Sequence, residues 1–123
     1  MTIDESPVLG RYYELLLGGI ESYGDGAELR ALLSDDFVFD GPIAGRMEGG
    51  VRFTHGVRGF IETVATVAIL RAVVTDDAAA VLYDAELPTG TVRFAEFFAF
   101  AGDRIRELYI HYNAAEYLAA GGR

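Results

Sequence analysis

The chain has no cysteine, and His55 and His111 are the only two histidines among its 123 residues. The absence of cysteine excludes disulfides, thiolate metal sites and a cysteine nucleophile. Two isolated histidines argue against a histidine-rich metal site. The sequence also lacks a phosphate-binding loop, a dinucleotide-binding fingerprint and the Gly-x-Ser-x-Gly elbow of serine hydrolases. We therefore expect no metal and no cofactor.

Long apolar runs and an excess of basic charge are missing as well. No apolar run approaches the 18 residues of a membrane-spanning helix. The 10 basic residues face 19 acidic ones, which gives a net charge of −9. Binding to nucleic acid or to an anionic membrane needs a basic surface, so neither partner is expected. Residues 1–7 are polar and do not have the pattern of a secretory signal. These absences favour a cytoplasmic protein.

What the chain does contain is apolar material for one core. Apolar residues make up 51% of the sequence, which excludes intrinsic disorder. A chain of this length is the size of a single domain, and we expect one domain over residues 1–123. There are no internal repeats and no low-complexity segments that would indicate a second one.

Hydrophobic periodicity predicts helices first and strands afterwards. Apolar residues at helical spacing predict helices over residues 7–22, 27–33 and 56–67. Alternating or continuous β-branched and aromatic runs predict strands over residues 37–40, 68–75, 79–87, 91–101 and 104–112. The glycine-rich segment 43–54 has no clear periodicity before residue 51 and is predicted to be a loop that could contain a hairpin. Residues 114–120 are expected to form a short helix or coil.

This order of elements predicts an α+β fold. The last four strands are joined by short turns, so they should form an antiparallel meander. Helices that precede such a sheet have to cover one of its faces. We therefore expect a cone-shaped, curved antiparallel sheet wrapped by three N-terminal helices and enclosing an apolar pocket.

Glu96 is the most informative residue of the predicted strand 91–101. It stands on one face in the middle of an apolar stripe formed by Val92, Phe94, Phe98 and Phe100. A carboxylate in such surroundings has a large desolvation cost, so it acquires a raised pKa or a partner. Either state suits a general acid or base. The alternative is that Glu96 reaches solvent or forms an ion pair with Arg93 or Arg71.

Other side chains are weaker candidates for a site. Tyr12 lies on the apolar side of the first helix, where its hydroxyl could point into a pocket, although a buried tyrosine needs only a hydrogen-bond partner. Asp40 ends the first strand and is either a second carboxylate or a turn former. His55 precedes the third helix, where capping or solvent exposure is the simpler interpretation. The side chains expected to contact a ligand are Phe39, Phe60, Phe94, Phe98, Tyr112 and His55.

Several phrases of the sequence resemble ketosteroid isomerases and SnoaL-like polyketide cyclases of the nuclear-transport-factor-two-like superfamily. They are Arg11-Tyr12-Tyr13-Glu14-Leu15, the run from Leu33 to Pro42, His55-Gly56, and Glu96-Phe97-Phe98-Ala99-Phe100 followed by Gly102-Asp103. The resemblance implies that Tyr12 donates a hydrogen bond to a substrate oxyanion. It also implies that Glu96 takes the place of the family's second donor, an aspartic acid. The general-base aspartate of the isomerases aligns with Gly41, next to Asp40.

Together the residues and the resemblance predict acid/base chemistry on a small hydrophobic molecule. The expected reaction is isomerisation or cyclisation of a hydrophobic carbonyl or polyketide-like substrate, with Glu96, Tyr12 and Asp40 as catalytic residues. One alternative is hydration of the epoxide hydrolase type. Another is a non-catalytic ligand-binding or dimerisation module of the same fold. The resemblance implies a homodimer, for which Arg93, Tyr109 and His111 would form a contact face.

Overall fold

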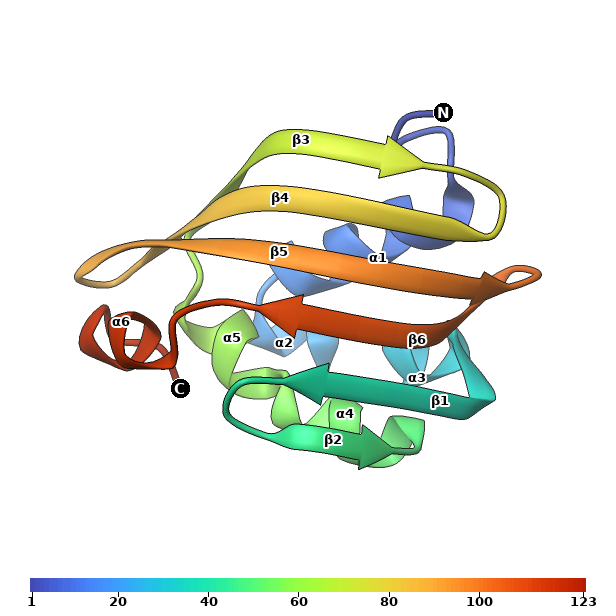
Figure 1. The fold of residues 1–123 in the computed structure, drawn as a ribbon. Coiled ribbons are helices and arrows are strands. Elements are labelled where there is room, and N and C mark those ends of the chain that lie inside the picture. Colours follow the sequence, from blue (N-terminus) through green and yellow to red (C-terminus); the bar gives the residue numbers. More distant parts are fainter.

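A computed structural model describes residues 1–123 and shows a mixed α+β fold (Figure 1). Five helical segments occur in the first half of the chain: α1 (Pro7–Leu17), α2 (Ile20–Tyr23), α3 (Ala27–Ala31), α4 (Gly50–Gly56) and α5 (Arg58–Thr63). The strands are β1 (Leu33–Gly41), β2 (Gly45–Glu48), β3 (Thr66–Val74), β4 (Ala78–Leu87), β5 (Gly90–Ala101) and β6 (Arg104–His111). The short helix α6 (Ala114–Ala119) follows the last strand.

The six strands form one curved, open sheet in the order β2-β1-β6-β5-β4-β3. Strands β3 to β6 make the predicted antiparallel meander, and helices α1 to α5 lie on one face of the sheet (Figure 1). The predicted α+β class and the helix-covered curved sheet are confirmed. One pairing differs from the prediction, because β1 runs parallel to β6. A parallel neighbour needs a long crossover rather than a tight turn, and the segment from β2 to β5 provides it.

Two local predictions are corrected. The helix predicted over residues 7–22 is divided, because α1 ends at Leu17 and Gly19 adopts a φ of +88° that breaks the helical path before α2. The loop predicted over residues 43–54 is wrong in its second half, since residues 50–54 belong to α4. The hairpin considered for this segment is present in its first half, where β2 pairs with β1 and Gly45 stands opposite Gly41. The glycines in and before α4 make its helical periodicity hard to recognise in the sequence.

The inner face of the sheet and the apolar faces of the helices form the core. Residues at alternate positions of β5 point toward the helices, and this places Glu96 in the same buried row as Phe94 and Phe98. On α1 the buried side includes Leu9, Tyr12, Tyr13 and Leu16. Burial of these side chains is the main favourable contribution to folding. It also brings the aromatic side chains of α1 against the middle of β5.

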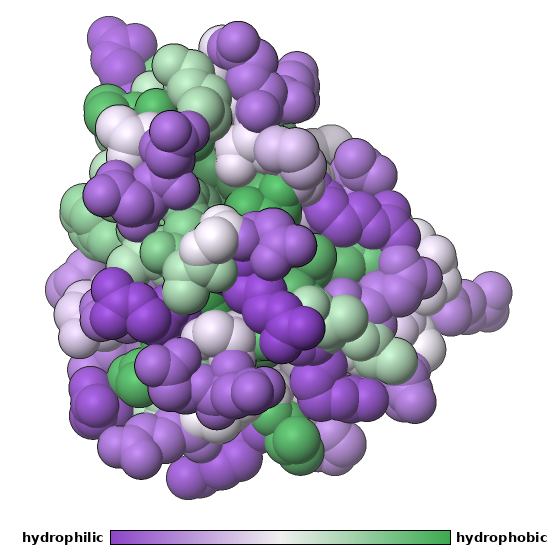
Figure 2. Space-filling model, turned by 90° about the vertical axis from the view of Figure 1, so that its right-hand side faces the viewer, coloured by the Kyte–Doolittle hydropathy of each residue, from purple (hydrophilic) through white to green (hydrophobic).

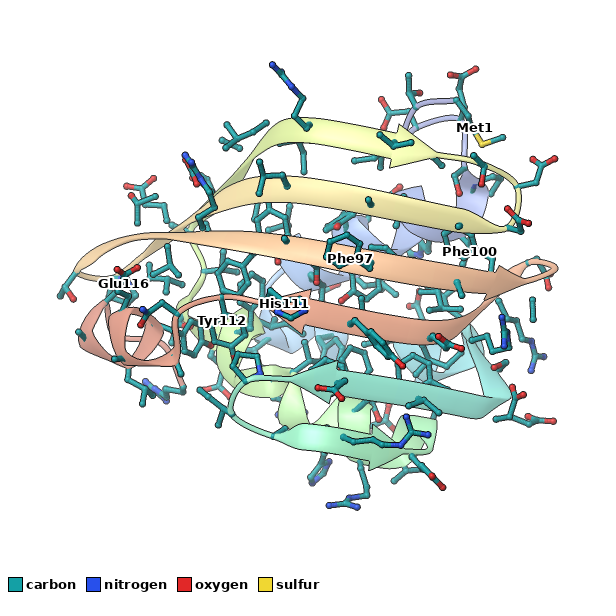
Figure 3. The ribbon with its side chains drawn as sticks, viewed as in Figure 1. Met1, Phe97, Phe100, His111, Tyr112 and Glu116 are labelled. Carbon is teal, nitrogen blue, oxygen red and sulfur yellow. The ribbon has the colours of Figure 1, made fainter.

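The other face of the sheet is open. Phe97 and His111 extend from it side by side, with ring centroids 6.1 Å apart (Figure 3). Phe97 and Tyr109 are large apolar side chains that remain substantially exposed there. A second view of the molecule shows mostly hydrophilic residues with small apolar patches between them (Figure 2). None of the helices has the length and apolar composition that crossing a bilayer would require.

Candidate functional site

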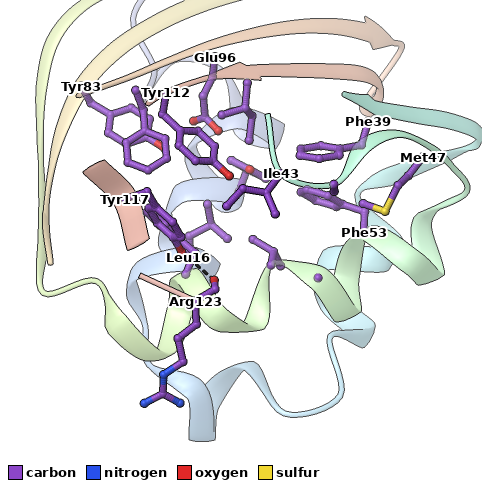
Figure 4. A pocket seen from close by; sticks show the side chains of 17 residues that line it. Leu16, Phe39, Ile43, Met47, Phe53, Tyr83, Glu96, Tyr112, Tyr117 and Arg123 are labelled. Atoms are coloured by element: carbon purple, nitrogen blue, oxygen red, sulfur yellow. Dashed lines mark hydrogen bonds between the residues drawn. The ribbon is translucent and has the colours of Figure 1, made fainter. Parts of the chain in front are cut away.

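A cavity of about 290 Å³ lies between the inner face of the sheet and the helices (Figure 4). Its volume is near the lower end of the range of small-molecule sites, roughly 300–1,000 Å³. Fourteen of its 17 lining residues are hydrophobic. The lining comprises Tyr12, Leu16, Phe39, Ile43, Ala44, Met47, Phe53, Gly56, Val57, Phe60, Tyr83, Phe94, Glu96, Ile110, Tyr112, Tyr117 and Arg123. A cavity with this lining suits a small apolar molecule.

Eight of the 17 residues that line the cavity are aromatic, and several of their rings contact one another. Phe94 from β5 stacks on Tyr83 from β4, with centroids 5.1 Å apart and an interplanar angle of 9°. Phe94 also contacts Tyr112, whose ring centroid is 4.7 Å away. Tyr112 in turn packs against Tyr117 of α6 at 5.1 Å. Rings that contact one another in this way have few alternative rotamers, so the wall is fixed in shape.

Glu96 is the only carboxylic acid in the lining, and it comes from the centre of β5. Only 1% of its surface is accessible to solvent. The hydroxyl of Tyr13 donates a hydrogen bond to its Oε1 atom at 2.7 Å. Glu96 has no ion pair, and Arg93 is bound to Asp84 on the outer face of the sheet. The alternative of a salt-bridged or exposed Glu96 is therefore excluded.

Burial determines the acidity of this carboxyl. Desolvation raises the pKa of Glu96 from its ordinary value of 4.5 to about 7, against the opposing effect of the hydroxyls of Tyr13 and Tyr83. The Tyr13 contact is the one at hydrogen-bonding distance, and the Tyr83 hydroxyl acts from nearby on β4. A carboxyl with this pKa can release and accept a proton near neutral pH.

The hydroxyl of Tyr12 is buried and has no hydrogen-bond partner among the protein groups. Tyr12 lines the cavity from α1, and its ring is held edge-on by Phe98, whose centroid is 5.4 Å away. Burial raises the pKa of Tyr12 well above 10, with a further contribution from the charge of Glu96, so the hydroxyl keeps its proton. A buried donor without a partner is costly, and a ligand oxygen in the cavity would satisfy it.

The structure brings some of the predicted ligand-contacting residues together and separates others. Phe39, Phe60, Phe94 and Tyr112 line the cavity. Phe98 is buried but packs behind Tyr12, because the cavity follows only part of β5.

Asp40 and His55 lie outside the cavity. The side chain of Asp40 is exposed, since it alternates along β1 with the inward-facing Phe39 and Gly41. Asp40 could act as a second carboxylate only if its side chain faced the cavity, and it does not. His55 is exposed in the last turn of α4, while the next residue, Gly56, lines the cavity.

Four polar residues of the site were not predicted from the sequence: Tyr13, Tyr83, Tyr117 and Arg123. The burial of Tyr13, though not its contact with Glu96, could have been predicted, because Leu9, Tyr13 and Leu16 recur at helical spacing. The guanidinium of Arg123 points away from the inner part of the cavity and binds Glu62 at 3.3 Å (Figure 4). No cation therefore faces Glu96. No group of three or more His, Asp or Glu side chains is close enough to hold a metal ion.

Comparison with known families and structures gives one sequence match and many matches of fold. The model of the family described as SnoaL-like domain matches residues 10–108. A search of the curated proteins found no match.

Three of the similar solved structures illustrate the fold. One is a protein from Kribbella flavida, with a TM-score of 0.79 and 22% identity over 94% of this chain and 91% of the other. Another is a steroid delta-isomerase from Pseudomonas aeruginosa, with a TM-score of 0.71 and 18% identity over 92% and 82% of the two chains. The third is an NTF2-like protein of unknown function from Cytophaga hutchinsonii, with a TM-score of 0.71 and 14% identity over 96% of each chain. At these identities the likeness is one of fold.

Proposed function

Because this chain belongs to the SnoaL-like domain family, we propose that it is a small-molecule enzyme that performs acid/base chemistry on a hydrophobic carbonyl compound. The observation that carries the proposal is the pair of Glu96 and Tyr12 in one apolar cavity. Glu96 is a buried carboxyl with a pKa of about 7, and Tyr12 offers an unpartnered hydroxyl. Some family resemblances point to isomerisation and others to cyclisation of a polyketide-like substrate, and the fold alone does not choose between them.

The proposed chemistry uses Glu96 as its one base, because Asp40 is outside the cavity. In an isomerisation, the ionised Glu96 removes a proton from the carbon next to the substrate carbonyl. The electrons of that C–H bond delocalise onto the carbonyl oxygen and form an enolate. Tyr12 donates a hydrogen bond to the enolate oxygen and stabilises its charge. Glu96 then returns the same proton to the γ-carbon, and the double bond moves into conjugation. These proton-transfer steps need no cofactor.

The test is the conversion of a bicyclic β,γ-unsaturated ketone to its conjugated isomer, followed by ultraviolet absorbance. Glu96→Gln removes the base and should reduce turnover by about 10²–10⁴-fold, the usual contribution of a general base. Asp40→Asn is the matched control, since it removes an exposed carboxylate of β1 and should leave turnover unchanged. Full turnover by Glu96→Gln would overturn the assignment of the base.

The second candidate function is a non-catalytic module that binds a hydrophobic ligand. It is favoured by the single carboxylate in the cavity, since the related isomerases are expected to use a second one. Binding of a bicyclic ketone with no turnover of any carbonyl probe by the wild-type protein would support this candidate over the enzyme.

We also propose that the chain forms a homodimer through the open face of the sheet. Two large apolar side chains, Phe97 and Tyr109, remain 49% and 39% exposed on this face. Arg93 and His111 lie beside them and supply polar groups for the rim of a contact. Sedimentation equilibrium should give the mass of two chains for the wild type and of one chain for Phe97→Lys. A monomeric wild type at micromolar concentration would refute the dimer.

A further inference from the structure

Tyr13 is adjacent to the catalytic candidate Tyr12, yet its environment is different. Its hydroxyl donates a hydrogen bond to Glu96 Oε1 at 2.7 Å. Only 8% of the surface of Tyr13 is accessible to solvent. The ring is held by edge contacts with Tyr12 at 5.2 Å and with Tyr83 at 6.1 Å. Successive residues of a helix point about 100° apart. Tyr12 therefore reaches the cavity directly, whereas Tyr13 does not line it and reaches Glu96 from behind.

The Tyr13 hydrogen bond leaves the two carboxyl oxygens of Glu96 in different situations. Oε1 accepts from the Tyr13 hydroxyl, whereas Oε2 has no protein donor at hydrogen-bonding distance, although the Tyr83 hydroxyl lies nearby. When Glu96 is ionised, Oε2 can accept a proton from a substrate. When Glu96 is neutral, Oε1 is the carbonyl oxygen that accepts from Tyr13, and the proton on Oε2 can be donated to a ligand. In both states the same oxygen is the reactive one.

We infer that Tyr13 is a positioning residue that holds the Glu96 carboxyl with Oε2 directed to the ligand and stabilises its ionised form. This inference rests on the proposed function in so far as Glu96 is the group that meets the ligand. It assigns different roles to two adjacent tyrosines of α1: Tyr12 contacts the ligand, and Tyr13 acts through Glu96. A donor to a carboxylate favours the charged state, so Tyr13 lowers the pH range over which Glu96 changes from donor to acceptor.

The groups around Glu96 leave Tyr13 as its principal polar partner. Helix α1 contributes Tyr12 and Tyr13, and β4 contributes Tyr83 beside the apolar Val81. On β6 the residue paired with Glu96 is Ile110. No histidine or basic side chain faces the carboxyl from these elements. Burial raises the pKa of Glu96, and the hydroxyls of Tyr13 and Tyr83 are the groups that lower it.

The experiment measures the pKa of Glu96 by NMR, from the side-chain carboxyl carbon of glutamate-labelled protein. Glu96 is identified by the signal missing from Glu96→Gln. In Tyr13→Phe, which removes only the hydroxyl, the pKa should rise by about one unit, the equivalent of one hydrogen bond to the ionised form. Tyr12→Phe is the matched control, because it deletes the adjacent hydroxyl, which does not bond to Glu96, and should leave the pKa in place.

A second variant keeps the tyrosine hydroxyl and reverses the direction of the expected change in the pKa of Glu96. Incorporation of 3-fluorotyrosine at position 13 gives a more acidic hydroxyl, which is a stronger donor to the carboxylate. The pKa of Glu96 should then fall below the wild-type value. This variant tests the inference even if Tyr13→Phe does not fold.

The functional readout is the affinity for 1-tetralone, an uncharged bicyclic ketone, as a function of pH. A ketone only accepts hydrogen bonds, so its affinity should fall as pH rises through the pKa of Glu96. The midpoint of this decrease should move upward in Tyr13→Phe by the same amount as the pKa.

The outcomes separate this inference from the proposed function. An unchanged pKa of Glu96 in Tyr13→Phe, or an equal change in Tyr12→Phe, would overturn the positioning role. The expected pKa changes without any binding of 1-tetralone would support the positioning role while opposing the proposed function. Binding of 1-tetralone with a midpoint that does not follow the pKa would overturn the link between Tyr13 and the ligand.

Discussion

The ring of Phe39 occupies the space that a side chain at position 41 would need. A Cβ atom added to Gly41 would lie 2.8 Å from the tip of that ring, and both residues face the interior from β1. Phe39 is itself packed on Phe53, with ring centroids 5.0 Å apart. The resemblance to the isomerases described above places their general-base aspartate at the position of Gly41. The cavity therefore has an aromatic ring where those enzymes are expected to have a second carboxylate.

This arrangement makes position 41 sensitive to the smallest substitution. Gly41→Ala should force the ring of Phe39 to move against Phe53 and should lower the free energy of unfolding by about 1–3 kcal/mol, as overpacking does. It should also weaken the binding of 1-tetralone, because Phe39 is part of the cavity wall. Urea denaturation and ligand titration measure the two effects. Asp40→Ala on the exposed side of the same strand should change neither, and a Gly41→Ala protein as stable as wild type would contradict the packing described.

The hydrophobic periodicity of the sequence was sufficient to predict most of the fold, because helices, strands and tight turns are each indicated by residues close together in the chain. The meander from β3 to β6 follows from short turns and alternating strands. The parallel pairing of β1 with β6 could not be predicted, since it depends on how distant segments pack. The glycines around α4 also removed the helical signal there.

The candidate site was predictable only in part. Glu96 could be identified because a carboxyl within an apolar stripe violates the strand pattern. Its partner Tyr13 could not be distinguished from Tyr12, since both lie on buried sides of α1 and only the packing decides which one reaches the cavity. Phe94 and Phe98 share one face of β5, yet only Phe94 lines the cavity, because the helices fill the other half.

The raised pKa of Glu96 predicts that stability decreases as pH rises from acidic to neutral values. The folded protein retains a proton between pH 4.5 and about 7 that the unfolded chain has lost. The contribution to stability is therefore complete below pH 4.5 and is lost as pH rises through about 7. A difference of this size corresponds to about 3 kcal/mol.

Comparison with Glu96→Gln isolates this contribution from the titration of other groups. The amide cannot titrate, so the difference in unfolding free energy between variant and wild type should change by about 3 kcal/mol in favour of the variant from pH 4 to pH 8. Urea denaturation at closely spaced pH values measures it. Asp40→Asn, an exposed carboxylate change, is the control. A constant difference between Glu96→Gln and wild type would mean that folding does not shift the pKa of Glu96.

The cap of α6 should control one wall of the cavity. The side chain of Asn113 accepts a hydrogen bond from the backbone N–H of Glu116 at 2.9 Å, and α6 carries Tyr117, which lines the cavity. Asn113→Ala should cost about 1 kcal/mol and increase amide exchange in residues 114–119. Asn113→Asp keeps the acceptor and should behave as wild type. Equal exchange in the alanine and aspartate variants would show that tertiary packing, rather than the cap, holds α6 in place.

Tyr12→Phe should separate stability from function. The Tyr12 hydroxyl is buried without a partner in the protein, so its removal should raise the unfolding free energy by about 1 kcal/mol, whereas Tyr13→Phe breaks a buried hydrogen bond and should lower it. The same Tyr12→Phe variant should bind 1-tetralone roughly tenfold more weakly, because the ketone oxygen loses its donor. Chemical denaturation and ligand titration of both variants test this opposite pattern. If Tyr12→Phe were destabilised as much as Tyr13→Phe, with unchanged affinity for the ketone, the Tyr12 hydroxyl would serve the fold and not the ligand.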